Sequence, residues 1–438
     1  MQRIVLIGAG STIFGLGVIG DIFKSKSLDG STIVLHDINP KALDNTYKIA
    51  KKYKEKLGKK ISIEATTSRK EALKDASFCL ISIEVGNRFD LWDQDWKMPL
   101  QYGVKQVYGE NGGPGGLFHS LRIIPPILEI CGDIQEICPD AYVFNYSNPM
   151  QRICHAVTTK FPDLKFIGLC HEIESMRRQL PTLMETELSN IEFRAGGLNH
   201  FSILLDAKYK NDGKDGYPSI RRNFRDYFKD LVNDHEGFVS DPGAERGVFF
   251  KIYEDFNYLP ITTDSHLGEY VQWAYSVADH GGILHFYDSY KEKCLTFFES
   301  DKLYSSFFDM DSHTFHERFV PIAEAIIEDQ EIEEASVNIP NNGFIDCLPT
   351  DIVVEVPAII NKKGIRGIKL SNYPKTFGSL LNLQTGVIQL TTQAVLEKSK
   401  HKAYLALLAD PVVTSVNNAE KLLNNMISAQ HKYLSYLN

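Results

Sequence analysis

The sequence predicts an α/β fold, in which a doubly wound parallel sheet occupies the first half and a mixed, mostly helical α+β region follows. Short apolar runs of strand length alternate with amphipathic segments of helical length over roughly the first 170 residues. Strands that are apolar throughout indicate a parallel sheet with both faces covered by helices. Beyond about residue 210 the pattern is mostly helical, with aromatic-rich segments.

Six strands are expected in the first half, at residues 3–9, 31–38, 62–67, 77–83, 141–147 and 165–170. Amphipathic stretches between them, such as residues 40–56 and 121–137, predict the covering helices. This alternation suits a Rossmann-like domain of the lactate/malate dehydrogenase type. Residues 193–209 show strand-like alternation.

The length of the chain predicts two domains, because 438 residues exceed what one hydrophobic core usually supports. The change from strand–helix alternation to a mostly helical pattern is gradual. We place the boundary near residue 195, which gives an N-terminal Rossmann-like domain over residues 1–195 and a C-terminal domain over residues 196–438.

Composition excludes several classes of protein. A formal net charge of −9 argues against nucleic-acid binding, which needs a basic surface. No apolar run reaches the roughly 18 residues of a membrane span, and the N-terminal "MQRIVLIGAG" lacks the features of a signal peptide. The seven cysteines show no repeated spacing, which suits reduced thiols. We therefore expect a cytoplasmic protein.

A glycine-rich turn follows the first predicted strand, in "IVLIGAGSTIF". Gly8 and Gly10 permit a tight turn and a close backbone approach to a pyrophosphate. The third glycine of the usual GxGxxG pattern is absent, because that position is Ile13 and the next glycine is Gly15. A turn of this kind directly after an N-terminal strand favours a dinucleotide site over an ordinary strand-to-helix connection.

Three further residues complete the predicted dinucleotide site. Ser11 and Thr12 open the following helix, whose free N–H groups and dipole favour a phosphate. Asp37 ends the second predicted strand, where a carboxylate takes the ribose hydroxyls and disfavours a 2′-phosphate. The sequence therefore favours NAD over NADP.

The sixth predicted strand ends in Cys170, His171 and Glu172. Ligands of open α/β sheets bind at the carboxyl ends of the strands, so this trio is expected beside the reactive end of the cofactor. Neighbouring residues of a strand point to opposite faces, so Cys170 and His171 are poorly placed to bind one ion together. His200 in "GGLNHF" offers Cys170 a better partner.

A third polar cluster lies in "TTDSHLGEY", which contains Asp264, His266, Glu269 and Tyr270. Each cluster also has a structural interpretation. A cysteine is most often a core residue, a histidine after an asparagine can cap a turn, and a polar loop can simply be solvated. Their occurrence together after a dinucleotide turn favours a functional interpretation.

The chain resembles glycoside hydrolase family 4, the NAD- and metal-dependent glycosidases, over nearly its whole length. The resemblance is carried by "GAGSTIF", "GPGG" (113–116), "NYSNPM" (145–150), "GLCHE" and "GLNH". The late segment "NNGFIDCLPTDIVVEVPAII" is also similar to the family's signature, with Cys347 where asparagine is usual.

Residues after the cysteine sort this family by substrate. The Cys-His-Glu-Ile of this chain differs by one conservative change from the Cys-His-Glu-Val of α-galacturonidases. The resemblance therefore implies an α-galacturonidase that hydrolyses uronide glycosides. Glu172 stands where α-galactosidases have serine and α-glucuronidases have glycine, and this single residue argues against both.

The resemblance implies an unusual mechanism with NAD+ and Mn2+ as cofactors. NAD+ oxidises C3 of the sugar, a base removes the acidified C2 proton, the aglycone is eliminated, water adds, and C3 is reduced again. A thiolate and an imidazole would by softness suit zinc, although the family favours Mn2+. Relatives also suggest a homodimer or homotetramer.

Roles carried over by position complete the prediction. Cys170 and His200 become the metal ligands, and Asn148 contacts the sugar hydroxyls. His171 could protonate the leaving group, since an imidazole titrates near neutrality. Tyr270 is the preferred C2 base and Asp264 its competitor.

A galacturonide also needs a cation for its carboxylate, because Glu172 would repel it. Candidate partners are Arg88, Arg122, Arg246 and His119. Most of these arginines are expected to be ordinary surface or ion-pair residues.

Two other classes of function remain open on the sequence. A 2-hydroxy-acid dehydrogenase shares the N-terminal architecture but leaves Cys170, His200 and the late "VEVP" segment unexplained, and it would consume NAD. A non-catalytic NAD sensor would bind NAD without a metal and without turnover.

Overall fold

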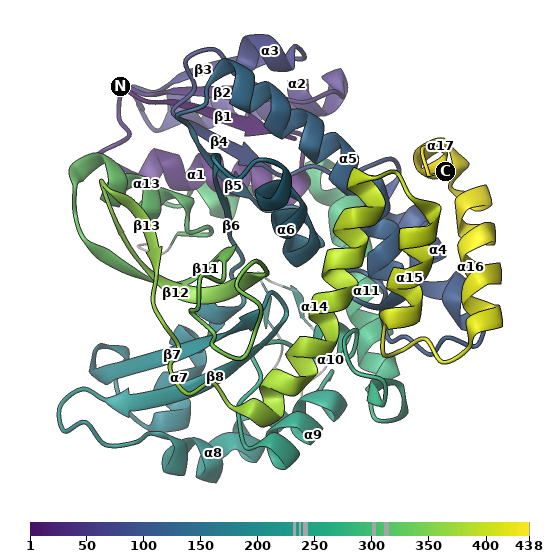
Figure 1. Cartoon of the computed structure of the whole chain (residues 1–438). Coiled ribbons are helices and arrows are strands. Elements are labelled where there is room, and N and C mark those ends of the chain that lie inside the picture. The colour runs from purple at the N-terminus through teal and green to yellow at the C-terminus, as the bar shows by residue number, and fades with distance from the viewer. Residues whose placement is uncertain (231–233, 236–237, 240–243, 300–303, 311–314, 438) are drawn as a thin grey trace.

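The computed structural model describes residues 1–230, 234–235, 238–239, 244–299, 304–310 and 315–437. One sheet runs through the molecule in the order β3-β2-β1-β4-β5-β6-β11-β12-β7-β8, and β13 pairs with β12. The sheet therefore continues from the Rossmann-like half into the second half of the chain (Figure 1).

The first six strands form the parallel part of the sheet. They are β1 (Arg3–Ile7), β2 (Thr32–His36), β3 (Ser62–Thr66), β4 (Phe78–Ile81), β5 (Tyr142–Asn145) and β6 (Lys165–Gly168). Every pairing among them is parallel, so their carboxyl ends share one edge. The predicted doubly wound fold is confirmed, although the sixth strand ends two residues before Cys170.

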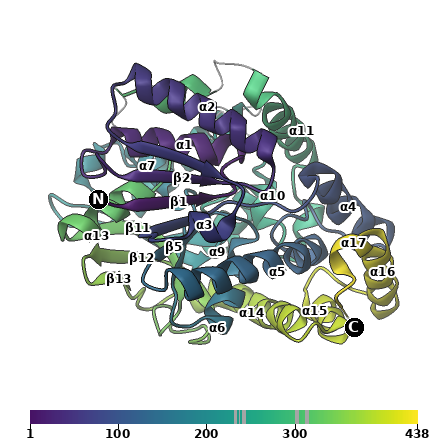
Figure 2. The ribbon, with the colours of Figure 1, turned by 90° about the horizontal axis from the view of Figure 1, so that it is seen from above.

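Alternate residues of the central strand face two different cores. Ile4 and Leu6 of β1 pack with one face's helices, while Val5 and Ile7 pack with those of the other. The first face carries α1 (Thr12–Lys24), α2 (Pro40–Lys56) and α13 (Phe319–Glu328). The second carries α5 (Gly113–Ile137) and α6 (Met150–Lys160). Both faces are therefore covered (Figure 2).

Antiparallel strands extend the sheet. They are β7 (Ile191–Leu198), β8 (Phe201–Tyr209), β11 (Ile332–Pro340), β12 (Val353–Asn361) and β13 (Gly364–Gly367). The strand-like alternation at residues 193–209 belongs to two strands, because the chain reverses at Asn199 and His200 to form the β7–β8 hairpin. The alternation continues through the turn, so the pattern alone does not reveal it.

Helices fill most of the remaining chain. They are α3 (Arg69–Ala72), α4 (Arg88–Gln101), α7 (Met176–Met184), α8 (Tyr217–Asp230), α9 (Gly247–Phe256), α10 (Asp264–Leu267), α11 (His280–Thr296), α14 (Lys375–Leu396), α15 (Lys400–Ala409), α16 (Val416–Ala429) and α17 (His431–Leu434). Two short strands, β9 (Asp234–His235) and β10 (Phe238–Val239), pair with each other. Within the described part of the chain, no helix is both long and apolar enough to span a membrane.

The C-terminal helices return to the first half of the molecule. Leu407 of α15 and Met426 of α16 share a core with Leu121 and Ile124 of α5. The end of the chain thus packs beside the N-terminal α/β layers (Figure 1). The two predicted segments share one sheet and one core, and a boundary at residue 195 remains a prediction.

Candidate active site

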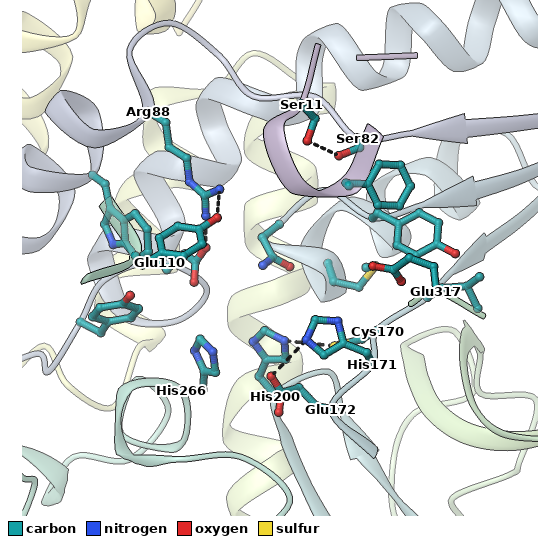
Figure 3. Close-up of a pocket in the computed structure, with 18 of the residues that line it drawn as sticks. Ser11, Ser82, Arg88, Glu110, Cys170, His171, Glu172, His200, His266 and Glu317 are labelled. Atoms are coloured by element: carbon teal, nitrogen blue, oxygen red, sulfur yellow. Dashed lines mark hydrogen bonds and ion pairs between the residues drawn. The ribbon is translucent and has the colours of Figure 1, made fainter. Parts of the chain in front are cut away.

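A cavity of about 250 Å³ opens at the carboxyl ends of the parallel strands. Its walls come from the turn after β1, the segments after β4, β5 and β6, the β7–β8 turn, α4, α10 and α11. Of the residues that the sequence singles out, the cavity is lined by Ser11, Arg88, Asn148, Cys170, His171, Glu172, His200 and His266 (Figure 3). The structure therefore gathers most of the predicted polar residues in one place.

The glycine turn after β1 has the geometry that its residues predict. Gly8 has a φ of +85°, and a Cβ there would lie 2.1 Å from the carbonyl oxygen of Ser82. A Cβ on Gly10 would lie 2.5 Å from the Ala42 side chain. The role of the third glycine falls to Gly15, where a Cβ would lie 2.5 Å from the Ala9 carbonyl, so α1 packs closely on the turn.

Asp37 and Ser11 flank this turn. The Asp37 carboxylate accepts a hydrogen bond from the Gly10 N–H at 2.8 Å, which fixes the carboxylate at the end of β2. Ser11 precedes α1 and lies 3.4 Å, oxygen to oxygen, from Ser82 at the cavity wall. Thr12 begins α1, but its side chain lies outside the described part of the structure.

Cys170 and His200 meet across 30 residues of chain. The Cys170 Sγ lies 3.4 Å from the His200 Nε2. His200 has a φ of 144° at the hairpin turn, and its carbonyl accepts a hydrogen bond from the Thr262 hydroxyl at 2.7 Å. The turn thus holds the imidazole against the thiol that follows β6.

Burial dominates the chemistry of this pair. It lowers the pKa of His200 to about 3, and the neighbouring His266 lowers it further. Burial also raises the pKa of the Cys170 thiol, with contributions from Glu355 and Glu172. The pair is therefore a neutral imidazole beside a protonated thiol, and a cation would have to displace the thiol proton.

A buried carboxylate, Glu355, accepts hydrogen bonds from residues on either side of His200. Glu355 of β12 is 1% exposed and accepts hydrogen bonds from Asn199 Nδ2 at 3.0 Å and Ser202 Oγ at 2.8 Å. The Asn199 side chain also hydrogen bonds with Cys170. Glu355 belongs to the "VEVP" segment, so this segment contacts the site through the β7–β8 hairpin.

His171 and Glu172 line the cavity beside the pair but differ in exposure. The side chain of His171 is 42% exposed and that of Glu172 only 8%, with His171 Nε2 and Glu172 Oε1 3.9 Å apart. Figure 3 places both at the same wall as Cys170. The His171 ring is therefore far more accessible to solvent than the Glu172 carboxylate.

The "TTDSHLGEY" cluster divides in the structure. His266 lines the cavity, with its ring centroid 4.5 Å from that of His200. Asp264 is not brought to the cavity, because its carboxylate accepts N–H bonds from Gly247 (2.8 Å), Phe249 (3.0 Å) and Asp279 (2.9 Å). This carboxylate organises the loop around α9 and α10.

Tyr270 lies one layer behind the main cavity. Its ring stacks on Phe201 at 5.2 Å, and its hydroxyl donates to the Asn199 carbonyl at 3.4 Å. It lines a small adjoining cavity that shares Met150 with the main one. Burial raises the pKa of this phenol, and the guanidinium of Arg152 opposes the rise.

Of the proposed carboxylate partners, Arg88 lies at the cavity. Its Nη2 donates to Glu110 Oε1 at 2.9 Å and its Nη1 to the Tyr290 hydroxyl at 2.7 Å. Its Nε lies 3.8 Å from Glu84 Oε2. Burial opposes ionisation of Glu84, but His119 and Arg88 outweigh it and lower its pKa to about 2.

The other proposed partners do not line the cavity. Arg122 is buried in an ion pair with Asp95 at 2.6 Å, where it joins α5 to α4. Arg246 stacks over the Phe249 ring at 5.0 Å. His119 lies behind the wall, with Nδ1 3.0 Å from the Glu110 carbonyl oxygen. Their roles in this structure are packing and pairing.

Sequence reasoning missed several residues that line the cavity. These are chiefly Trp92, Tyr108, Glu110, Phe286, Tyr290 and Glu317. Glu110 stands three residues before the "GPGG" motif, which would have been a reason to consider it. The aromatic residues of α4 and α11 belong to no recognisable motif, so only the fold identifies them.

Two family models match the chain. The model for family 4 glycosyl hydrolases matches residues 3–186, and the model for the C-terminal domain of this family matches residues 195–413. The chain belongs to the family 4 glycosyl hydrolases. The expectation that this protein is a glycoside hydrolase is therefore confirmed.

Curated relatives of this family 4 enzyme differ in substrate. It is 49% identical to an α-glucosidase from Erwinia rhapontici, with 99% of each chain covered. It is 30% identical to an α-galactosidase from Bacillus subtilis (94% and 93% covered). It is 28% identical to an α-galacturonidase from Thermoanaerobacterium saccharolyticum (98% and 96% covered).

Solved structures share the fold. A putative glucosidase from Bacillus subtilis superposes with a TM-score of 0.83 at 26% identity, covering 97% of this chain and 99% of that one. A 6-phospho-α-glucosidase from gut microorganisms, solved in complex with NAD and Mn2+, superposes with a TM-score of 0.81 at 21% identity, covering 98% of each chain. The Rossmann-like architecture is therefore common to these enzymes.

Proposed function

We propose that this family 4 enzyme is an α-glucosidase that acts on uncharged α-glucosides. The main observation behind this proposal is that Arg88 is paired with Glu110 and Glu84. Among the described residues that line the cavity, it is the only lysine or arginine, and Glu110 and Glu84 neutralise it. A cation already paired with two carboxylates has little attraction left for a sugar carboxylate or phosphate.

Two further observations support an uncharged substrate. Glu172 and Glu317 also line the cavity, and their carboxylates would repel an anionic sugar. The identity of 49% to an α-glucosidase over the full length exceeds the 28% to an α-galacturonidase. Charge and similarity thus favour the same substrate class.

NAD fits the turn after β1. Gly8 and Gly10 leave no room for side chains there, and the N-terminus of α1 follows at Thr12. Asp37 stands at the end of β2, the position that takes the ribose hydroxyls. When bound, NAD would supply a hydride acceptor at the strand ends, as the NAD-bound 6-phospho-α-glucosidase suggests.

A divalent metal fits Cys170 and His200. Ligand bonds of about 2.0–2.3 Å place adjacent donor atoms roughly 3 to 3.6 Å apart, and the Sγ–Nε2 distance is 3.4 Å. Within the described residues no group of three or more His, Cys, Asp or Glu side chains forms a complete metal site. The remaining positions would then be open to sugar oxygens, where a metal supplies a Lewis acid.

Three residues of the chain are proposed to orient the sugar and move protons. Asn148 would hydrogen bond the hydroxyls beside the Cys170–His200 pair. His171, with its solvent-accessible ring, would protonate the leaving oxygen. Tyr270 remains our candidate for the C2 base, and its hydroxyl would have to leave the Asn199 carbonyl to reach the sugar. Asp264 is less suited, because three backbone N–H groups occupy its oxygens.

An α-galacturonide is the second candidate substrate. It rests on the Cys-His-Glu-Ile sequence at residues 170–173, which differs by one residue from the pattern of α-galacturonidases. In that case Arg88 would have to exchange Glu110 for the sugar carboxylate. An α-galactoside is a third candidate substrate, supported by the identity of 30% to an α-galactosidase.

A parallel assay tests the proposal. Purified protein with NAD+, Mn2+ and thiol is offered p-nitrophenyl α-glucoside, α-galactoside, α-glucuronide and α-galacturonide. Release from the glucoside in preference to the others is expected. Release only from the galacturonide would overturn the proposal in favour of the second candidate. A separate reaction in deuterium oxide tests the mechanism, because a product without deuterium at C2 would exclude the C2 proton abstraction.

A further inference from the structure

The cavity has an aromatic end that the chemistry described above does not use. Trp92 of α4, Tyr108, and Phe286 and Tyr290 of α11 line it. Trp92 and Tyr108 meet edge to face with ring centroids 4.8 Å apart, and Phe286 stacks on Tyr290 at 6.2 Å. Aromatic surfaces of this size bind apolar faces of ligands.

Two buried polar atoms at this end lack protein partners. Trp92 is 4% exposed and Tyr108 is fully buried, yet the Trp92 Nε1 and the Tyr108 hydroxyl have no hydrogen-bond partner among the described residues. Buried polar groups in native proteins are almost always satisfied. Partners for an indole N–H and a phenol beside a cavity would come from a ligand with oxygen atoms or from water.

Arg88 and Glu110 add a fixed polar pair to the aromatic end. The Arg88 guanidinium stacks 5.1 Å from the centroids of both Trp92 and Tyr290. Glu110 Oε2 accepts from Asn111 Nδ2 at 3.1 Å, and a carboxylate has further acceptor sites for hydroxyl groups. The pair is neutral overall, so it favours an uncharged, hydroxylated ligand.

The two ends of the cavity are spatially separate. Figure 3 shows Arg88 and Glu110 across the cavity from Cys170 and His171, with His266 and His200 between. One sugar ring held at Cys170, His200 and Asn148 leaves the aromatic end open. A second group of similar size therefore has a place there.

We propose that the aromatic end is a subsite for the leaving sugar of the substrate, an uncharged hexosyl ring whose face stacks on Phe286 and Tyr290 and whose hydroxyls bond Trp92, Tyr108 and Glu110. This inference rests on the proposed α-glucosidase function and specifies its aglycone. Because the leaving sugar would then lie across the cavity from His171, the proton for the leaving oxygen would come from His266, which lies between the two ends. The enzyme is then a disaccharidase that reads both rings of its substrate.

Matched substrates and variants test the subsite. Methyl α-glucoside lacks a second ring and maltose has one, so a change in the ratio of their kcat/KM values between a variant and the wild type reports the subsite. Tyr108→Phe removes one hydroxyl and keeps the ring, and it should lower the maltose-to-methyl-glucoside ratio about three- to tenfold. Phe286→Ala removes a stacking face and should lower the ratio about tenfold.

Tyr404→Phe on α15 is the control, because this half-buried tyrosine does not line the cavity, and it should leave the ratio unchanged. An unchanged ratio in both Tyr108→Phe and Phe286→Ala would overturn the subsite, including the case in which both substrates lose equally. If the wild-type protein hydrolyses neither glucoside, the proposed function fails and the hexosyl subsite with it. Turnover of both glucosides with an unmoved ratio overturns the subsite alone.

Discussion

Glu355 of β12 accepts a hydrogen bond from Asn199 Nδ2 at 3.0 Å, directly beside His200 in the β7–β8 turn. The same Asn199 side chain bonds Cys170, so one buried carboxylate orients both sides of the Cys170–His200 pair. Replacing partners that orient metal ligands typically costs about 10- to 100-fold in metal affinity. The geometry of the pair therefore depends on a strand more than 150 residues further along the chain.

Replacing this carboxylate should weaken metal binding. Glu355→Gln removes a buried negative charge and places an amide N–H against the Ser202 hydroxyl, so Mn2+ affinity should fall about tenfold. Mn2+ titration followed by electron paramagnetic resonance measures it. Glu334→Gln is the control, because Glu334 is equally buried but pairs with Arg318 and does not line the cavity. Unaltered Mn2+ affinity in Glu355→Gln would contradict the role.

Removing the Cys170 thiol should abolish metal-dependent turnover but leave NAD binding intact. Cys170→Ser is expected to lose at least about 100-fold in Mn2+-dependent turnover, because a serine hydroxyl is a poor replacement for a thiolate ligand. NAD binding, followed by fluorescence titration, should stay within about twofold. Cys347→Ser replaces another partly exposed thiol and should behave as the wild type. Normal turnover of Cys170→Ser would refute the metal assignment.

A methyl group on the glycine turn should block NAD. Gly8→Ala puts a Cβ 2.1 Å from the Ser82 carbonyl at a φ of +85°, so the turn must move and NAD affinity should fall at least about tenfold. Gly58→Ala has a similar φ of +62° but nothing within 4 Å, so it isolates backbone strain. Gly58→Ala should cost about 1 kcal/mol of stability and leave NAD binding intact. Equal NAD affinities in the two variants would argue against the predicted site.

Glu269 should make stability fall with rising pH. Burial and the nearby Glu110 raise its pKa to about 8, so the native state holds a proton that the unfolded chain releases near pH 4.5. The contribution of Glu269 to the free energy of unfolding should therefore decrease between about pH 4.5 and 8, by on the order of 5 kcal/mol, and stay level above. The test compares urea denaturation of the wild type and Glu269→Gln across this range.

The expected difference between the two proteins has a definite sign. Glu269→Gln stays neutral at every pH, so its stability should exceed that of the wild type most at pH 8 and least at pH 5. The Glu269 carboxylate accepts N–H bonds from Glu110 and Asn111, and the glutamine oxygen can keep them. A constant difference from pH 5 to 8 would show that the native and unfolded pKa values are alike.

The parts of the site that could be predicted are those encoded locally. Gly8, Gly10 and Asp37 follow strands whose apolar runs are visible in the sequence, and the carboxyl ends of parallel strands converge by geometry. Cys170 was placed by the same reasoning. His200 is also predicted as its partner, although the strand-like alternation around it does not reveal the turn that carries it.

Other residues could not be assigned, because their function depends on contacts between distant segments. Asp264 looks like a catalytic carboxylate in its polar loop, but three backbone N–H groups occupy it. Arg122 looks like a substrate ligand near a motif, but Asp95 takes its charge in the core. Of the four proposed cations, Arg88 alone lines the cavity, and its pairing with Glu110 and Glu84 changes what it can attract.

The doubly wound sheet, the dinucleotide turn and the family are all predictable from the sequence, because each depends on residue types within one short segment or on their order along the chain. Which charges are neutralised, and which polar atoms are left for a ligand, becomes visible only in the folded molecule. Burial and hydrogen bonding set the pKa of a side chain and decide which of its donors and acceptors stay unused. The groups that bury and bond a side chain come from segments far away in sequence, as Glu355 does for Asn199 and α11 does for Arg88.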